Sequence, residues 1–338
     1  MIEDPDVLHT VSWKDIPTPQ LGDAVIVYLV PDSSQLPVPT GPDKKALGFY
    51  FAKEHDPGKL GAGSVSVPIY LPRDMAFYFE YTRITDQTST VIAYSKLLVS
   101  MDQYVCTHFH LATTHEPNEM LIQYVTSQLD DKQHFVEIST TPFEGNPTNS
   151  MFFPANDTKL HYKRTDMFEE PATSQNFWID PGRFRESLVI GLKPNTRYLY
   201  RVVDSNKKPI SKEFFFISAP IPGADDTKTD LYIFGDLGVA FPFYTTVQQQ
   251  PPSEKTTTSI FKQLTEKHNR GDFSHSSLLL IGDISYARGY HWMWEYFFKQ
   301  IEPIASQMPF HVSIGNHEYD YLKQKWKPGM LCLQFYLI

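Results

Sequence analysis

Short apolar runs separated by Pro, Asp and Gly occupy the first two-thirds of the chain. The early runs are rich in β-branched and aromatic residues, and turn residues bound each of them. Closely spaced runs of this kind are typical of an all-β sandwich. We therefore predict an N-terminal β-sandwich domain over residues 1–104, with strands at 24–30, 47–52, 64–71 and 76–84.

A second series of short runs follows and predicts a fibronectin type III-like β-sandwich over residues 105–219. Within it, the Pro194-Asn195 turn leads into an alternating strand whose Tyr198 is placed to form a tyrosine corner. The seven predicted strands are 105–112, 119–126, 134–140, 158–163, 186–191, 197–203 and 213–218.

The pattern changes after a linker at 219–226. Three apolar runs, at 231–234, 278–281 and 310–314, are continuous rather than alternating, as in parallel strands that are buried on both faces. Helical spacing of apolar residues at 254–268 and 291–306 separates these runs. The pattern predicts a partial α/β domain over residues 229–338, with the order β-α-β-α-β and right-handed crossovers.

The composition of the chain limits the classes of partner that it is expected to bind. The chain has 338 residues and a net charge of −9, which argues against binding of a nucleic-acid polymer or an anionic membrane. The apolar stretch Pro328–Ile338 is about half of the ~20 residues that a membrane span needs. The acidic N-terminus shows no signal peptide. Two cysteines, Cys106 and Cys332, leave the redox compartment undecided.

Each of the three continuous runs is followed at once by Gly and then by a polar residue, in Gly235–Gly238, Gly282–Tyr286 and Gly315–Glu318. Ligands of open α/β sheets bind at the carboxyl ends of adjacent strands, so these groups are expected to converge. Carboxylate, amide and phenol oxygens suit hard or borderline cations. The sequence thus predicts a metal site, and two ions held ~3.5–4 Å apart would suit phosphoryl transfer.

The ordered motifs resemble those of the purple acid phosphatases, a family of the metallophosphoesterase superfamily. The stretch from Gly282 to Tyr321 is particularly similar to the long plant-type members. Residues 11–17 and 61–64 resemble the extra N-terminal domain of those long forms. Residues 177–184 and 192–200 resemble their fibronectin-like domain, so the resemblance covers about residues 8–321.

The resemblance implies a dinuclear centre with Fe(III) and a divalent iron, zinc or manganese ion. Asp236 and Tyr286 would bind the ferric ion, Asp283 would bridge the two ions, and Asn316 would bind the second. His317 would act as the catalytic residue that contacts the phosphate and stabilises the leaving group.

One departure from the family pattern concerns three further histidine ligands, from Val-x-x-His and Gly-His-x-His segments. No histidine follows His317. We interpret His291 as a partly exposed residue at a helix start, His311 as a core residue, and His108 and His110 as structural. The chain is therefore expected to be a C-terminally truncated member with an incomplete site, in which half of the α/β sandwich is missing and apolar faces are exposed.

Two functions stay open at this point. The first is a metal-dependent acid phosphatase that hydrolyses phosphoric esters through metal-bound hydroxide, or, within the same class, a nucleotide pyrophosphatase/phosphodiesterase. The alternative is a catalytically inactive form that acts as a β-sandwich binding protein. The resemblance implies a secreted or vacuolar glycoprotein and admits a homodimer, and Asn156 lies in the plausible N-glycosylation sequon.

Overall fold

The structure is a computed structural model that describes residues 8–30, 46–55, 61–68, 76–85, 88–99, 106–144, 150–167, 170–175, 178–224, 228–241 and 253–319. The acidic N-terminus, Cys332 and the segment around Tyr321, on which the sequence-based predictions also rest, lie outside these ranges.

The N-terminal strands form two packed sheets. One has the order β3-β2-β5-β6, with β7 paired to β5, and the other pairs β1 with β4. Trp13 of β1 lies against Tyr81 of β5, with ring centroids 5.9 Å apart, so aromatic side chains fill the space between the sheets. The predicted strands are present and three more accompany them. The bounds are β1 (Leu8–Trp13), β2 (Ala24–Val30), β3 (Ala46–Phe51), β4 (Gly63–Pro68), β5 (Ala76–Ile84), β6 (Ser89–Tyr94) and β7 (Leu98–Val99), with a 3-10 turn at Ala52–His55.

The next seven strands pair in the order β14-β13-β10-β11-β12-β9-β8. Strands β8 and β14, which stand at the two ends of this order, face each other across the core of the sandwich. The ring centroids of Phe109 in β8 and Phe214 in β14 are 4.5 Å apart. The predicted tyrosine corner is confirmed, since the Lys193 N–H donates to the Tyr198 hydroxyl at 2.9 Å. The bounds are β8 (Thr107–Ala112), β9 (Met120–Thr126), β10 (His134–Ser139), β11 (Met151–Asp157), β12 (Arg183–Val189), β13 (Arg197–Asp204) and β14 (Phe214–Ile217).

One strand of this unit was predicted in the wrong place. The strand lies at Met151–Asp157, and residues 158–163 are irregular. The sequence pattern did not predict this strand because it contains Pro154, and proline has no N–H group to donate to a sheet ladder. Tyr162 leaves the sheet altogether, since its fully buried ring packs on the α/β segment and its hydroxyl contacts Nε2 of His291 at 2.6 Å.

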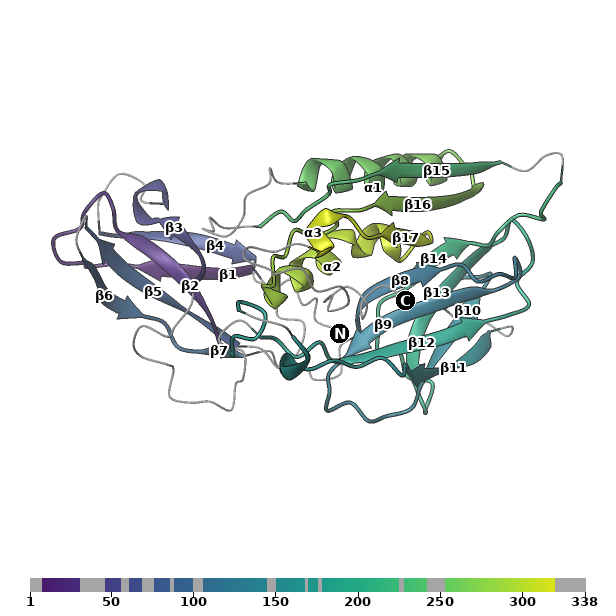
Figure 1. Cartoon of the computed structure of the whole chain (residues 1–338), viewed down its shortest axis with the longest axis horizontal. Coiled ribbons are helices and arrows are strands. Elements are labelled where there is room, and N and C mark those ends of the chain that lie inside the picture. The colour runs from purple at the N-terminus through teal and green to yellow at the C-terminus, as the bar shows by residue number, and fades with distance from the viewer. Residues whose placement is uncertain are drawn as a thin grey trace.

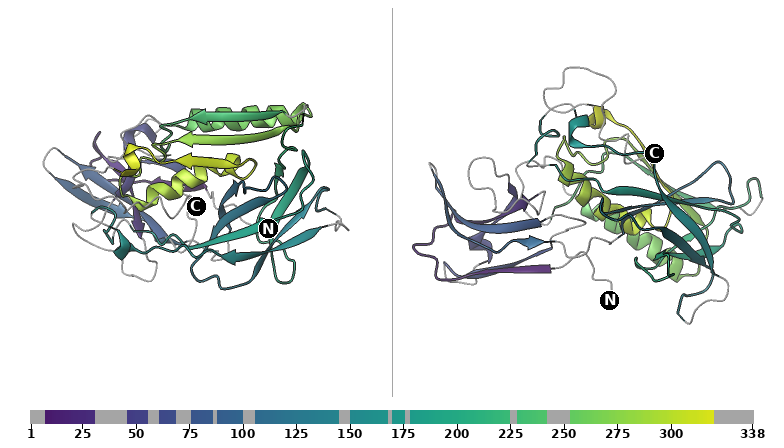
Figure 2. Two further views of the ribbon diagram at one scale, coloured as in Figure 1. Left: turned by 45° about the vertical axis from the view of Figure 1, so that its right-hand side comes forward. Right: turned by 90° about the horizontal axis from the view of Figure 1, so that it is seen from below.

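The C-terminal segment is a three-stranded parallel sheet with the order β15-β16-β17, as predicted. Both long helices cover the same face, as successive crossovers of one hand require, and they contact each other. Figure 1 and Figure 2 show this segment beside the second set of strands, with β1 to β7 at the other end of the molecule. The bounds are β15 (Thr229–Phe234), α1 (Glu254–Asn269), β16 (His275–Ile281), α2 (His291–Ala305), β17 (Phe310–Ser313) and α3 (Asn316–Tyr319).

The apolar runs predicted strands that are buried on both faces, which is wrong, whereas the exposed apolar face expected of an incomplete α/β sandwich is present. Leu278 and Leu280 of β16 are fully buried under the helices, whereas Leu231, Ile233 and Ile281 point to the other face and are more than half exposed. The runs look continuous because apolar residues occupy both faces of the sheet, yet in the described structure only one face is covered by helices.

Helix α2 of the α/β segment packs against the second sandwich. It packs on β8, where His108 and Glu295 are both buried and their side chains lie 3.3 Å apart. The His110 side chain reaches the Phe310 carbonyl of β17 at 2.6 Å. These contacts agree with the structural role expected for His108 and His110. Among the described helices, none is long and apolar enough to cross a membrane.

Candidate metal site

Three loops meet at the carboxyl edge of the parallel sheet, where β15, β16 and β17 end. Backbone hydrogen bonds tie the first loop to the second, from Asp236 N to the Gly282 carbonyl at 3.1 Å and from Leu237 N to the Asp283 carbonyl at 3.1 Å. Asp236 and Asp283 both adopt positive φ angles, 56° and 50°. This left-handed backbone turns the chain sharply at the strand ends, so both carboxylates stay at the sheet edge.

The side chains of Asp236, Asp283 and Tyr286 meet at this edge. The Tyr286 hydroxyl donates to Oδ1 of Asp236 at 2.8 Å, and it lies 3.3 Å from Oδ2 of Asp283. Burial and the hydrogen bond to Asp236 raise the pKa of Tyr286 well above its ordinary value, so without a cation the phenol keeps its proton. Three of the four predicted ligand residues are thus brought together.

The spacing of these oxygens fits one hard cation. Neighbouring oxygen ligands of an octahedral ion bound at about 2.1 Å lie about 3 Å apart, close to the two distances observed here. The donors are two carboxylates and a phenol, which are the oxygen ligands that such ions prefer. The residues therefore fit a single hard ion that takes the place of the phenolic proton.

Within the described ranges, no group of three or more His, Cys, Asp or Glu side chains could hold a metal ion, so the two carboxylates at this edge are joined only by the Tyr286 phenol. Asn316 lies at the start of α3, is exposed, and takes no part in the hydrogen bonds that join the three oxygen donors. The oxygen donors that meet at this edge are therefore those of Asp236, Asp283 and Tyr286.

His317 lies beside these donors. Its ring centroid is 4.5 Å from that of Tyr286, and its backbone N–H donates to Oδ1 of Asp283 at 2.9 Å. The side chain is half-buried at the rim of the site. An imidazole in this place can hold or give a proton to a group bound at the oxygen donors.

Glu318 ends the third motif, although the sequence-based predictions gave it no role. Its buried carboxylate accepts three backbone N–H groups, those of Asp283, Ile284 and Gly315. The signal that could have found it is its place two residues after Asn316, where a buried carboxylate next to two glycine-containing loops serves to satisfy their backbone donors.

Two other histidines near these loops are structural in their contacts. His291 is buried rather than partly exposed, because the Tyr162 hydroxyl holds its ring and Trp178 packs on it at 4.8 Å between ring centroids. His311 is half-buried on the sheet face away from the helices and contacts Thr113 at 3.5 Å, so it is not the core residue expected.

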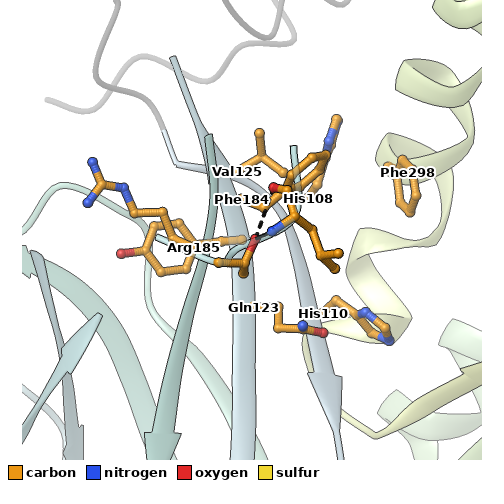
Figure 3. Close-up of a pocket in the computed structure, with 10 residues that line it drawn as sticks. His108, His110, Gln123, Val125, Phe184, Arg185 and Phe298 are labelled. Atoms are coloured by element: carbon orange, nitrogen blue, oxygen red, sulfur yellow. Dashed lines mark hydrogen bonds between the residues drawn. The ribbon is translucent and has the colours of Figure 1, made fainter. Parts of the chain in front are cut away.

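A small pocket lies elsewhere, between the second sandwich and α2 (Figure 3). His108, His110 and Phe298 line it from the two sides, together with Arg185. The polar groups serve the fold, since Arg185 donates to backbone carbonyls of the sandwich and His108 pairs with Glu295. The pocket contains none of the oxygen donors described above.

Comparisons with known proteins point to one group. Residues 106–218 match the family model described as "Purple acid Phosphatase, N-terminal domain". The chain is 30% identical over 334 residues to "Probable inactive purple acid phosphatase 9" of Arabidopsis thaliana, which covers 94% of this chain and 48% of that protein. It is 32% identical over 212 residues to "Probable inactive purple acid phosphatase 24" of the same plant, covering 60% and 31%.

A solved structure shows the same arrangement. The purple acid phosphatase PPD1 from yellow lupin (Lupinus luteus) seeds superposes with a TM-score of 0.71 at 28% identity, over 90% of this chain and 53% of that one. The chain therefore spans about half the length, or less, of the relatives that it matches.

Proposed function

Because the chain belongs to the purple acid phosphatase family, we propose that Asp236, Asp283 and Tyr286 bind a hard metal cation as part of a phosphoric-ester hydrolase site. The observation that carries this proposal is the contact of the Tyr286 hydroxyl with both carboxylates, at 2.8 and 3.3 Å. Two carboxylates and a phenol meet at the strand ends, where α/β sheets bind their ligands, although Asp236 and Tyr286 are 50 residues apart in the chain.

The side chains have separate roles in this proposal. Asp236 and Asp283 would supply the negative charge that offsets the cation, and Tyr286 would hold it through the phenol oxygen after losing its proton to solvent. A bound cation supplies Lewis-acid stabilisation of a phosphoryl oxygen. His317 faces the same space, and its ring contributes the proton that the departing oxygen takes up. The iron(III) and divalent pair implied by the family would need ligands beyond those described.

The substrate class proposed is a phosphate monoester or a nucleotide, with a nucleotide pyrophosphatase/phosphodiesterase as the variant within the class. The support is the chemistry of the site. Hard cations bind phosphoryl oxygens, and the net charge of −9 disfavours long polyanions as substrates.

A second candidate function is a catalytically inactive protein that retains one metal ion. Two observations favour it. Two of the matched relatives are named as probable inactive purple acid phosphatases, and among the described residues no group of three or more His, Cys, Asp or Glu side chains could hold a metal. In this case the sandwiches would carry the binding function and the metal would stabilise the loops.

The test combines metal binding with hydrolysis. The full chain is titrated with Mn²⁺ or Fe³⁺ by calorimetry and assayed with a chromogenic phosphate monoester and a nucleotide diester. Asp283→Asn should abolish metal binding, whereas Asp272→Asn, which alters a partly exposed carboxylate paired with Lys228, should not. Hydrolysis that Asp283→Asn abolishes supports the enzyme, and binding without hydrolysis supports the inactive form. Failure of the unaltered chain to bind either metal would refute both.

We further propose that the chain follows the secretory route and carries a glycan at Asn156. This residue is exposed in β11, opposite Glu186 of β12, and Thr158 completes the sequon. Expression in plant cells should add a glycan mass that Asn156→Gln removes. An unmodified secreted product would count against glycosylation at this position.

A further inference from the structure

The carboxylate of Glu318 lies between the loop that follows β16 and the turn that follows β17. Oε1 accepts the N–H of Ile284 at 2.9 Å, and Oε2 accepts the N–H groups of Asp283 at 2.9 Å and of Gly315 at 2.7 Å. The side chain thus joins two of the three loops at the candidate metal site. Its burial would be costly without these bonds, because a carboxyl group must satisfy its oxygens when it leaves water.

The loop that Glu318 holds is a strained one. Gly282 has φ at 97°, and Asp283 follows with φ at 50°, in the left-handed region that disfavours residues other than glycine. Strained backbone of this kind persists only where its surroundings determine it. The two bonds from Asp283 and Ile284 to one carboxylate fix the peptide groups on both sides of the Asp283 side chain.

The turn that follows β17 fits closely against the same side chain. A Cβ atom at Gly315 would collide with Oδ1 and the backbone nitrogen of Asp283, so only glycine allows this approach. Oδ1 of Asp283 also accepts the His317 N–H at 2.9 Å. With Oδ1 held by α3, Oδ2 is the oxygen that faces the Tyr286 hydroxyl.

We propose that Glu318 is a positioning residue that sets the direction of the Asp283 carboxylate toward Tyr286 and thereby determines metal affinity. This inference rests on the proposed metal site. Glu318 is not itself a ligand, because both its oxygens already accept backbone N–H groups. Residues that hydrogen-bond to a metal ligand without binding the metal themselves typically change the metal affinity about 10–100-fold when they are replaced.

The test uses Glu318→Gln in the full chain, with terbium(III) as the probe. Terbium is a hard cation that prefers oxygen ligands, and the nearby Tyr286 ring sensitises its luminescence. The amide that this substitution introduces presents an N–H₂ group to backbone donors and cannot accept all three of them. Glu302→Gln is the matched control, because Glu302 is also buried and accepts a backbone N–H, from Phe109 at 3.3 Å, but lies on α2 at the sandwich.

We expect Glu318→Gln to weaken terbium binding at least tenfold and Glu302→Gln to leave it unchanged, although both lower the thermal midpoint. Equal affinity in Glu318→Gln and the unaltered chain would overturn the positioning role. If the unaltered chain binds no terbium, the proposed metal site fails instead, and the two failures are distinct.

Should Glu318→Gln not fold, Glu318→Asp gives the same comparison, since it keeps the charge and shortens the side chain by one methylene. Hydrogen exchange of the peptide that spans residues 282–286 is then measured in parallel. Faster exchange together with weaker terbium binding supports the proposal. Exchange and binding equal to those of the unaltered chain contradict it.

Discussion

Nε2 of His108 lies 3.3 Å from Oε2 of Glu295, and each side chain is 2% exposed or less. The two residues come from the second sandwich and from helix α2. A buried carboxylate beside an imidazole depends on its partner, because neither group has water to replace the contact. The pair is therefore one of the buried contacts that hold the α/β segment against the sandwich.

The effects of removing the two members of this pair should not be additive. We expect Glu295→Leu to lower the free energy of unfolding by about 3–5 kcal/mol, since it leaves His108 buried beside an apolar group. The double variant with His108→Leu should lose less than the sum of the two single variants. Urea unfolding of all four proteins measures this coupling. Strict additivity would show that the pair contributes no coupling energy.

Stability should fall on mild acidification. Burial lowers the pKa of His110 and of His275, so the unfolded chain takes up these protons at a higher pH than the folded chain does. The stabilisation is complete above the ordinary histidine pKa of about 6.5 and is lost as the pH falls below it, by at most about 1.4 kcal/mol per pH unit for each group.

Urea unfolding at pH 7.5, 6.5 and 5.5 tests this expectation. His110→Gln keeps a donor for the Phe310 carbonyl but cannot titrate, so its stability should depend less steeply on pH. His115→Gln is the control, because that side chain is 89% exposed. An unchanged slope in His110→Gln would show that this residue is not responsible.

Two glycines in equivalent positions should respond differently to alanine. A Cβ at Gly315 would overlap Asp283, whereas at Gly235, after β15, it would meet its nearest atom at 3.4 Å, an ordinary contact. We expect Gly315→Ala to destabilise the protein by about 1–3 kcal/mol and to weaken metal binding. Gly235→Ala should cost under about 1 kcal/mol. Thermal unfolding and metal titration compare them, and equal losses would contradict the close packing of Gly315.

The open face of the parallel sheet should promote self-association. Replacing Ile233 and Ile281 by Thr keeps β-branched side chains in the strands and removes exposed apolar groups. We expect less dye binding and less sedimentation of oligomers, with stability changed by about 0.5 kcal/mol or less. Leu280→Thr, on the covered face of β16, should instead cost about 2–5 kcal/mol. Oligomers that persist in the Ile233 and Ile281 variant would place the association elsewhere.

Sequence patterns predicted the succession of β-sandwich strands and the β-α-β-α-β segment, because turn residues and apolar spacing reflect local backbone preferences. They failed where a long-range contact decides the structure. Pro154 hid β11, and Tyr162 leaves the sheet in order to reach His291. Apolar runs alone also could not show which face of β15 is covered, because this depends on what packs against it.

The candidate site was predicted in part. The motifs located Asp236, Asp283 and Tyr286, since glycine followed by a polar residue after a buried strand has a known geometric meaning. The place of Glu318 in the third motif was visible in the sequence, but its backbone partners were not, because they depend on how closely two loops approach in space. The buried contact of His291 could not be predicted either, since Tyr162 is distant in the chain.

Helix α2 packs both in the α/β segment and against the second sandwich. Twelve of its fifteen residues are buried, some under the parallel sheet and some against β8 of the sandwich. The second sandwich therefore depends on α2 to cover one of its sides. Joined to another protein without α2, it would expose the side of β8 from which His108 contacts Glu295 and Phe298, so the sandwich and the helix should be kept together when either is moved.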